Sequence, residues 1–260
     1  MSFQTGRITL FGFLILVCAF IVLFIELAKR GWKFELRKIE GVTAMEEGVN
    51  RAVEMGRPVH WTEGHPFGSK LYDSNGPYLV AGLAILNYVT ALCARLKARL
   101  LVNIGHTELF PVVHELVRYI YVAEGAADRY VDDDIQLMPE QSYAIAVVGR
   151  MERNSVGCHI QTGYFWSQDM VLVPEVAQGI GAIVVTGAQI DAVPYLIMYS
   201  SSVFIADEFF AAAADITKDP TDVGGMMGCE WLKVVAMFLA LAGSILVTLG
   251  NNVLLGLTNF

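Results

Sequence analysis

The residues best placed to do chemistry stand where short apolar runs of the sequence stop. The segment "GAIVVTGAQIDAVPYLIMYSSSVFIADEFF" (181–210) shows this twice, since "AIVVTG" and "SVFIA" each stop at small or acidic residues before a helix-like stretch. If such runs are parallel strands, their ends share the edge of the sheet where open α/β sheets bind ligands. The candidate binding residues at five such ends are Glu63, His65, Gly105, His106, Thr162, Gly163, Tyr164, Thr186, Gly187, Gln189, Asp207 and Glu208.

The same residues also have a purely structural explanation. Glycine ends strands because it turns easily. Asp207 can cap a helix that starts at Glu208. We favour this structural interpretation and keep the ligand cleft as the alternative.

Known signatures of nucleotide, hydrolase and metal chemistry are absent from the sequence. No G-x-G-x-x-G follows the first strand, and no G-x-x-x-x-G-K-[ST] or G-x-S-x-G occurs. The acidic run Asp132–Asp134 lacks the glycine and the alternating spacing of a calcium loop. The 4 cysteines form no C-x-x-C pair, and the 5 histidines are dispersed. We therefore predict no cofactor and no metal, and lean towards a protein that is not an enzyme.

The elements that must position the candidate residues alternate between strand-like and helix-like segments across residues 39–228. The strand-like segments are short, continuous apolar runs that do not alternate in polarity, which is typical of a parallel sheet covered on both faces. We expect a doubly wound α/β domain with about five mostly parallel strands. The helix-like stretch from Pro77 to Ala94 carries no charge and competes as a third membrane span, but Asn87, Thr90 and its flanking turn and strand favour a buried helix.

Apolar segments at both ends of the chain predict two membrane spans. The composition is 55% hydrophobic and only 17% charged, and no charge occurs in 8–25 or 234–260. Each run is long enough to cross about 30 Å of hydrocarbon as a helix. A cleaved signal peptide is the rival for the first run, but it has no small-x-small cleavage site. We place the spans at 8–28 and 232–256.

The distribution of basic residues predicts the orientation. Only Arg7 precedes the first span, and no charged side chain follows the second. The positive-inside rule then places the central domain in the cytoplasm and both termini outside, in the cell (inner) membrane. A net charge of −8 without a basic stripe argues against nucleic acid as a partner. The basic residues that follow the first span are Lys29, Arg30, Lys33, Arg37 and Lys38.

Two motifs resemble a family of prokaryotic membrane proteins known only as a domain of unknown function. The first is an E-x-x-x-R-A-x-E-M-G-R-P helix-to-strand entry, and the second is a late G-A region with a proline and an acidic pair. The resemblance implies a membrane-anchored α/β architecture and no established chemistry. The chain departs from the family at Ala192, Tyr195, Leu196 and Ala206. The matching residues are Glu47, Arg51, Ala52, Glu54, Met55, Gly56, Arg57, Pro58, Gly181, Ala182, Gly187, Pro194, Asp207 and Glu208.

Two functional hypotheses follow from these observations. The first is a structural, assembly or partner-binding module that self-associates or binds another membrane or cytoplasmic protein. The alternative is a membrane-bound protein that binds a small ligand, or an enzyme, at the strand-end cleft. In the second span, small and polar residues recur every fourth position and could pack against another helix. These residues are Ala236, Ala240, Ser244, Thr248 and Asn252.

Overall fold

The chain divides into two compact units. One is Lys38–Ile216, and the other combines the two chain ends, Met1–Arg37 and Thr217–Phe260. The computed structural model describes residues 8–34, 39–65, 70–166, 168–205 and 207–248.

Unit Lys38–Ile216 contains a six-stranded sheet whose paired strands are all parallel, in the order β3-β2-β1-β4-β5-β6. The sequence predicted about five strands, and the additional one is β3, a three-residue strand on the edge beside β2. The strands are β1 Val59–Thr62, β2 Leu100–Ile104, β3 Ile135–Leu137, β4 Cys158–Thr162, β5 Ile183–Gly187 and β6 Ser202–Phe204.

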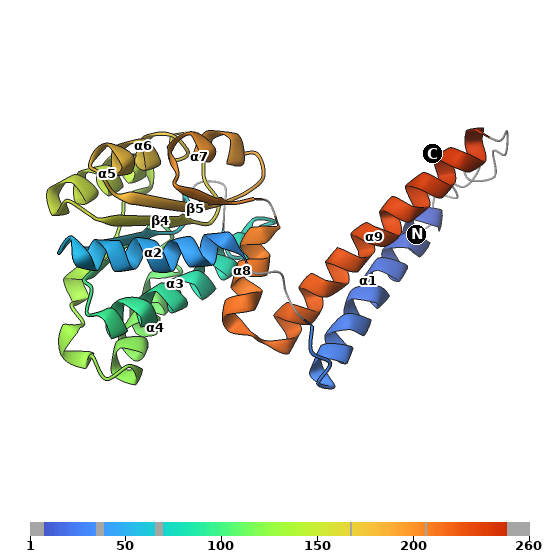
Figure 1. Cartoon of the computed structure of the whole chain (residues 1–260), viewed down its shortest axis with the longest axis horizontal. Coiled ribbons are helices and arrows are strands. Elements are labelled where there is room, and N and C mark those ends of the chain that lie inside the picture. The colour runs from blue at the N-terminus through green and yellow to red at the C-terminus, as the bar shows by residue number, and fades with distance from the viewer. Residues whose placement is uncertain (1–7, 35–38, 66–69, 167, 206, 249–260) are drawn as a thin grey trace. The chain divides into compact units, whose positions relative to one another are not determined.

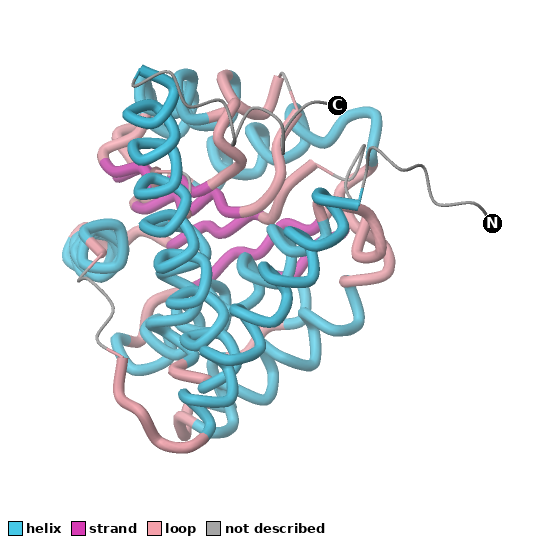
Figure 2. The backbone as a smooth tube through the Cα atoms, turned by 90° about the vertical axis from the view of Figure 1, so that its right-hand side faces the viewer, coloured by secondary structure: helices cyan, strands magenta, loops and turns pink. Residues whose placement is uncertain are grey.

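Helices cover both faces of this sheet, as the predicted doubly wound fold requires (Figures 1 and 2). One face is packed by α2 Glu40–Glu54, α3 Gly76–Leu96, α4 Phe110–Ala123 and α8 Glu208–Thr217. The other face is packed by α5 Tyr143–Asn154, α6 Leu172–Gly179 and α7 Val193–Tyr199. Single 3₁₀ turns occupy Ala127–Arg129, Asp132–Asp134 and Glu140–Ser142.

Helix α3 belongs to the core of this unit. Leu79, Ile85, Leu86 and Val89 are buried within the main apolar cluster beside the sheet. By length and composition, α3 is one of three helices among the described residues that could cross a membrane, together with α1 (Ile8–Lys29) and α9 (Pro220–Thr248). Half of its apolar window is buried within the protein, against 6% for α1 and 0% for α9.

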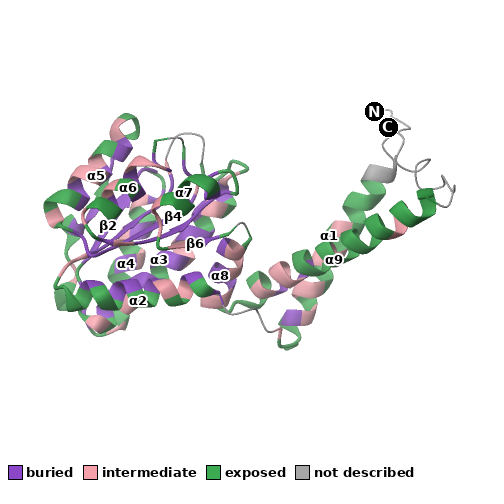
Figure 3. Cartoon of the chain, turned by 45° about the horizontal axis from the view of Figure 1, so that its top comes forward, coloured by how far each residue is buried: buried purple, intermediate pink, exposed green. Residues whose placement is uncertain are grey.

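The two faces of the sheet differ in polarity. Val59 and Trp61 of β1 point into the apolar cluster with α3, whereas their neighbours His60 and Thr62 are buried on the other side. In β4, Ile160 is likewise apolar and Gln161 is a buried polar residue. The expectation that strands would not alternate in polarity is therefore wrong for β1 and β4. Every residue of both strands is buried. Figure 3 shows the sheet around β4 in the colour of buried residues.

The second unit is an antiparallel pair of helices, α1 and α9. A Cβ atom added to Gly224 would lie 2.7 Å from Cα of Ile25, and one added to Gly228 would lie 3.2 Å from Cα of Ile21. These glycines form a G-x-x-x-G spacing that permits close helix packing. Most of the "KDPTDVGGMMG" segment (218–228) forms the first turns of α9.

The predicted packing row in the second span is exposed along its described length. Its described residues, Ala236, Ala240, Ser244 and Thr248, are all exposed, and Asn252 lies outside the described residues. The hydroxyls of Ser244 and Thr248 donate to the carbonyls four residues earlier, at 2.9 and 2.8 Å. Gly224 and Gly228 are the α9 residues that approach the backbone of α1 closely.

Candidate functional site

The crevice between β1 and β4 is filled by the protein's own backbone. The strand order reverses there, and Rossmann-like folds of this order bind dinucleotides at that point. Here the N–H of His65 donates to the carbonyl of Tyr164 at 2.7 Å. A Cβ atom on Gly64 would lie 1.9 Å from that carbonyl oxygen, and Gly163 has φ +139°. Both positions therefore require glycine, and the contact puts the chain's own backbone at the point where such folds hold a pyrophosphate.

The first candidate residue, Glu63, occupies an anion-binding position at the end of β2. One oxygen of its carboxylate accepts hydrogen bonds from the backbone N–H groups of Gly105 and His106, both at 3.0 Å. The same oxygen accepts from Nδ1 of His106 at 2.8 Å. Successive N–H groups of this kind are a common phosphate cradle. In this protein the cradle holds a carboxylate of the chain itself.

This arrangement fixes the protonation of His106. Because Glu63 is held by two backbone donors, Nδ1 of His106 must carry the proton that it shares with the carboxylate. In the neutral ring Nε2 is then the basic nitrogen. Both side chains are only 2% exposed. The pair is a carboxylate-oriented imidazole, an arrangement that proteins use to move protons.

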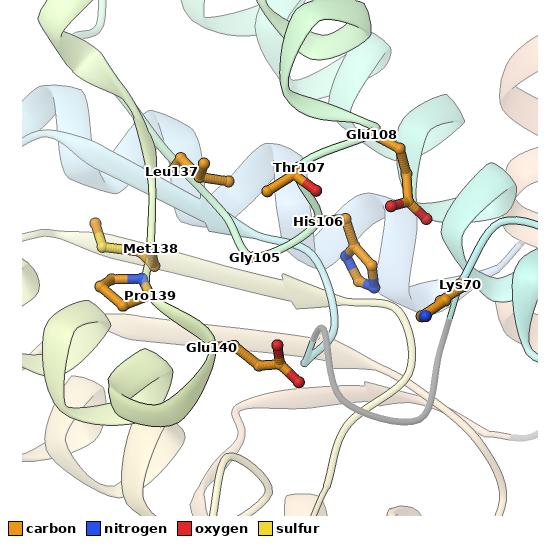
Figure 4. Close-up of a pocket in the computed structure, with 9 residues that line it drawn as sticks. All are labelled: Lys70, Gly105, His106, Thr107, Glu108, Leu137, Met138, Pro139 and Glu140. Carbon is orange, nitrogen blue, oxygen red and sulfur yellow. The ribbon is translucent and has the colours of Figure 1, made fainter.

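A pocket of about 470 Å³ lies beside this pair, at the carboxyl ends of β2 and β3. Figure 4 shows Lys70, His106 and Glu108 on one side, and Leu137, Met138 and Pro139 on the opposite side. The volume falls within the range of small-molecule sites. The lining is completed by Gly105, Thr107 and Glu140.

A second pair of acidic and imidazole side chains, Asp169 and His65, lies near the carboxyl end of β1. Oδ2 of Asp169, in the loop after β4, is 3.8 Å from Nε2 of His65. The ring of His65 packs edge-on against Tyr143 of α5 at a centroid distance of 5.4 Å. Burial raises the pKa of Asp169 to about 7. The Tyr143 hydroxyl donates to the carbonyl of Glu63 at 2.8 Å, which connects this group to the first pair.

A directed chain of hydrogen bonds runs from the middle of the sheet to the loop of Asp169. The Gln161 amide donates to the carbonyl of Asp169 at 2.9 Å, so its oxygen must accept from Nε2 of His159 at 3.2 Å. Nδ1 of His159 is therefore the acceptor of the 2.8 Å bond from Nδ1 of His60. Both imidazoles are neutral in this arrangement, and burial lowers the pKa of each, to about 4 for His159.

Arg150 of α5 anchors the other end of this polar layer. Its guanidinium donates to the carbonyl of Val102 at 2.9 Å and to that of Asp134 at 2.7 Å. It also donates to the side-chain oxygen of Asn103. Burial lowers the pKa of Arg150 to about 10. The layer thus extends from α5 across β2, β1 and β4.

Several predicted site residues have structural roles in the folded chain. Thr162 accepts from the indole of Trp61 at 2.9 Å, and the Thr186 hydroxyl is 2.9 Å from that of Ser200. Gln189 bonds both backbone groups of Phe165, which joins the loops after β4 and β5. Gly187 packs against the rings of Phe204 and Phe209.

The remaining predicted residues lie apart from the pocket lining. The ring of Tyr164 is 6.3 Å from that of Tyr78. Asp207 and Glu208 begin α8 beyond β6, where the Glu208 carboxylate accepts from the N–H of Ile205 at 3.2 Å. Of the predicted site residues, Gly105 and His106 line the pocket and Glu63 supports it.

The sequence interpretation missed most residues of this region. His60, Asn103, His159 and Gln161 lie inside strands for which the sequence analysis predicts apolar residues, although histidine and glutamine in "VHWT" and "CHIQT" are a visible signal. Glu140 follows the short strand β3 in "LMPE", so recognition of this strand end would have added it.

The strand order and the pocket at the carboxyl edge define a doubly wound α/β protein, which also carries apolar helices long enough to span a membrane. The chain belongs to the family described as Domain of unknown function (DUF6754), whose sequence model matches residues 1–257. No curated protein and no solved structure matches the chain.

Proposed function

We propose that this protein is a membrane-anchored domain that binds a small polar molecule in the pocket at the ends of β2 and β3. The observation that carries the proposal is the buried Glu63–His106 pair on the pocket wall. A carboxylate that holds an imidazole in one tautomer next to a cavity has a recognised use in ligand binding and proton transfer.

The charges of the lining favour a ligand with both an amine and an acidic group. Glu108 and Glu140 can accept from an ammonium, and Lys70 can pair with a carboxylate or phosphate. Leu137 and Met138 supply an apolar wall for the carbon skeleton. An amino-acid-like molecule therefore fits better than a dinucleotide, whose usual crevice is closed.

The test is a thermal-shift screen of the full-length chain in detergent against small zwitterions, amines and acids. A ligand at 100 times its Kd should stabilise the protein by about 2.7 kcal/mol. Glu108→Gln and Lys70→Met should each weaken binding about tenfold and leave the unliganded melting temperature unchanged. Glu115→Gln is the matched control, because Glu115 is an exposed carboxylate on α4 outside the pocket lining. Equal binding by all variants would contradict the proposal.

A second candidate function is assembly with a protein partner, favoured by the apolar surface around α7. The exposed fractions are 69% for Ile190, 55% for Ile197 and 67% for Met198. Apolar groups gathered on one surface mark interaction sites. Ile197→Ser with Met198→Ser should reduce the mass of the gently extracted complex. Tyr119→Ser, at an equally exposed aromatic on α4, should leave the mass unchanged.

We further propose that α1 and α9 are the spans and that the α/β unit is cytoplasmic. The basic residues after α1 support this orientation. In a chain with Cys18 and Cys229 replaced by serine, external thiol reagents should label Ser2→Cys and miss Asp133→Cys. Labelling of Asp133→Cys alone would reverse the orientation.

A further inference from the structure

The register of α1 against α9 offsets their charge-free segments. Gly224 lies level with Ile25 and Gly228 with Ile21, so residue numbers rise along α9 as they fall along α1. Each residue advances a helix by about 1.5 Å. The same register places Glu230 roughly level with Ala19 and Lys233 roughly level with Leu16. Figure 1 shows the two helices side by side.

Two charged residues of α9 are therefore level with the uncharged segment of α1, which covers residues 8–25. Lys233 lies roughly 13 Å along the helix from the level of Ile25, near the middle of that segment. If α1 crosses the bilayer, this depth is too great for a lysine side chain to reach the interface. Glu230 and Lys233 then belong to the membrane region.

Both charges are on the side of α9 that faces away from α1. Gly224 and Gly228 are buried against α1, whereas Glu230 and Lys233 remain 51% and 47% exposed. Within one chain they pair with each other, Nζ to Oε1, at 2.8 Å. Half-exposed charges in hydrocarbon are costly, and in membrane proteins they face a partner or a wet cavity.

We propose that a second copy of this chain packs against this face of α9, with Glu230 of each copy beside Lys233 of the other. The inference rests on the proposed membrane insertion of α1 and α9. Opposite charges three residues apart make the face self-complementary, because a two-fold axis along the membrane normal sets like residues opposite one another. The offset of about 4.5 Å is within reach of both side chains.

Small residues further along the same face permit close approach of the two copies. Ala240 follows Lys233 by two helical turns, and Ser244 continues the face. Ser244 contributes through its small size, because its hydroxyl already donates to the carbonyl of Ala240. The occupant of this face is a second α9, because its charges are complementary to those of the first and its side chains at the contact are equally small.

The experiment mixes two charge variants of the full-length chain that carry different affinity tags. Glu230→Lys has two lysines on the face, and Lys233→Glu has two glutamates, so neither retains the intrahelical pair. In a mild detergent each variant alone should self-associate at least about tenfold more weakly than wild type. Co-expressed, the two should co-purify as a mixed pair, because only the intermolecular contact is restored.

Three results would overturn the proposal. They are a monomeric wild type in membrane extracts, variants that self-associate like wild type, and a mixture that fails to co-purify. Phe238→Ala, at an exposed apolar residue of α9, is the control and should leave association unchanged. Carbonate extraction distinguishes the causes, since a chain washed from membranes would refute the proposed insertion itself. The thermal-shift assay on the same samples tests the pocket separately.

Discussion

The two faces of the sheet in this protein differ in the kinds of side chain that they bury. On the side of α3, the strands contribute Val59, Trp61, Val102 and Ile160 to a continuous apolar cluster. On the side of α5, the alternating positions contribute imidazole, amide and hydroxyl groups beside the apolar Leu101 and Val184. Both faces are equally buried, so burial alone does not distinguish them. The polar face contains His60, Thr62, Asn103, His159, Gln161 and Thr186.

The comparison suggests a division between stability and chemistry. Apolar burial stabilises without direction, at about 25 cal/mol per Å². Buried polar groups must be hydrogen-bonded, so they specify positions but add little net stability. Among the described residues, five buried side-chain atoms nevertheless have no hydrogen-bond partner of good geometry: His60 Nε2, Glu63 Oε2, Asn103 Nδ2 and both oxygens of Asp169. The polar face is thus the better candidate for a site.

The largest effect should come from the apolar face. Trp61→Ala removes a fully buried side chain and leaves the Thr162 hydroxyl without its donor. We expect a loss of about 4 kcal/mol in the free energy of unfolding, measured by chemical denaturation of the full chain in detergent. Trp166→Ala, at a half-exposed tryptophan, is the control. A loss below about 1 kcal/mol for Trp61→Ala would contradict the view that the apolar face contributes more to stability than the polar face.

The next largest effect should come from the anchor of the polar face. Arg150→Met leaves buried oxygens of Asn103 and Asp134 without their donor. We expect a loss of about 3 kcal/mol, measured by the same denaturation. Arg150→Lys should recover part of it, because one ammonium can serve fewer acceptors. An Arg150→Met variant as stable as wild type would show that the hydrogen bonds of Arg150 in the polar layer do not contribute to the free energy of unfolding.

The pH dependence of stability can separate two groups of the polar face. Burial lowers the pKa of His159 to about 4, so its contribution is complete above pH 6.5 and is lost as pH falls towards 4. Burial raises the pKa of Asp169 to about 7, so its contribution is complete below pH 3.8 and is lost as pH rises through 7. The two slopes oppose each other between pH 4 and 6.5.

Substitution of either residue alone should therefore change the slope of the free energy of unfolding against pH, in opposite directions for the two residues. Relative to wild type, the stability of Asp169→Asn should rise more steeply with pH, by about 1.4 kcal/mol per pH unit. That of His159→Gln should rise less steeply by a similar amount. Urea denaturation at several pH values measures both slopes. Parallel profiles for all three proteins would mean that each group binds protons equally in the folded and unfolded states, so that burial shifts neither pKa.

The smallest effect should come from the family motif on α2. Arg51 and Glu47 form a surface ion pair, and both side chains are 59% exposed. Arg51→Ala should change the free energy of unfolding by no more than about 0.5 kcal/mol. A larger loss would give this exposed motif residue a structural role that its contacts do not explain.

Local sequence patterns were sufficient for much of the architecture. Apolar runs followed by glycine or acidic residues predicted β1, β2, β4, β5 and β6, because strand ends have a strong local composition. The length of the charge-free runs 8–25 and 234–260 predicted two helices able to cross a membrane, and α1 and α9 contain the described parts of these runs. The short strand β3 was only faintly indicated, since three residues carry little periodic signal.

The order of elements and the apolar ends of the chain follow from local sequence patterns alone. The contacts between buried polar side chains depend on the tertiary structure, because their residues are far apart in the sequence. His60 pairs with His159, 99 residues away, and Glu63 pairs with His106, 43 residues away. Such pairs depend on strand order and register, and a shift of one residue would turn each side chain to the opposite face. The closure of the β1–β4 crevice by Gly64 and Tyr164 likewise follows from the way the strands assemble.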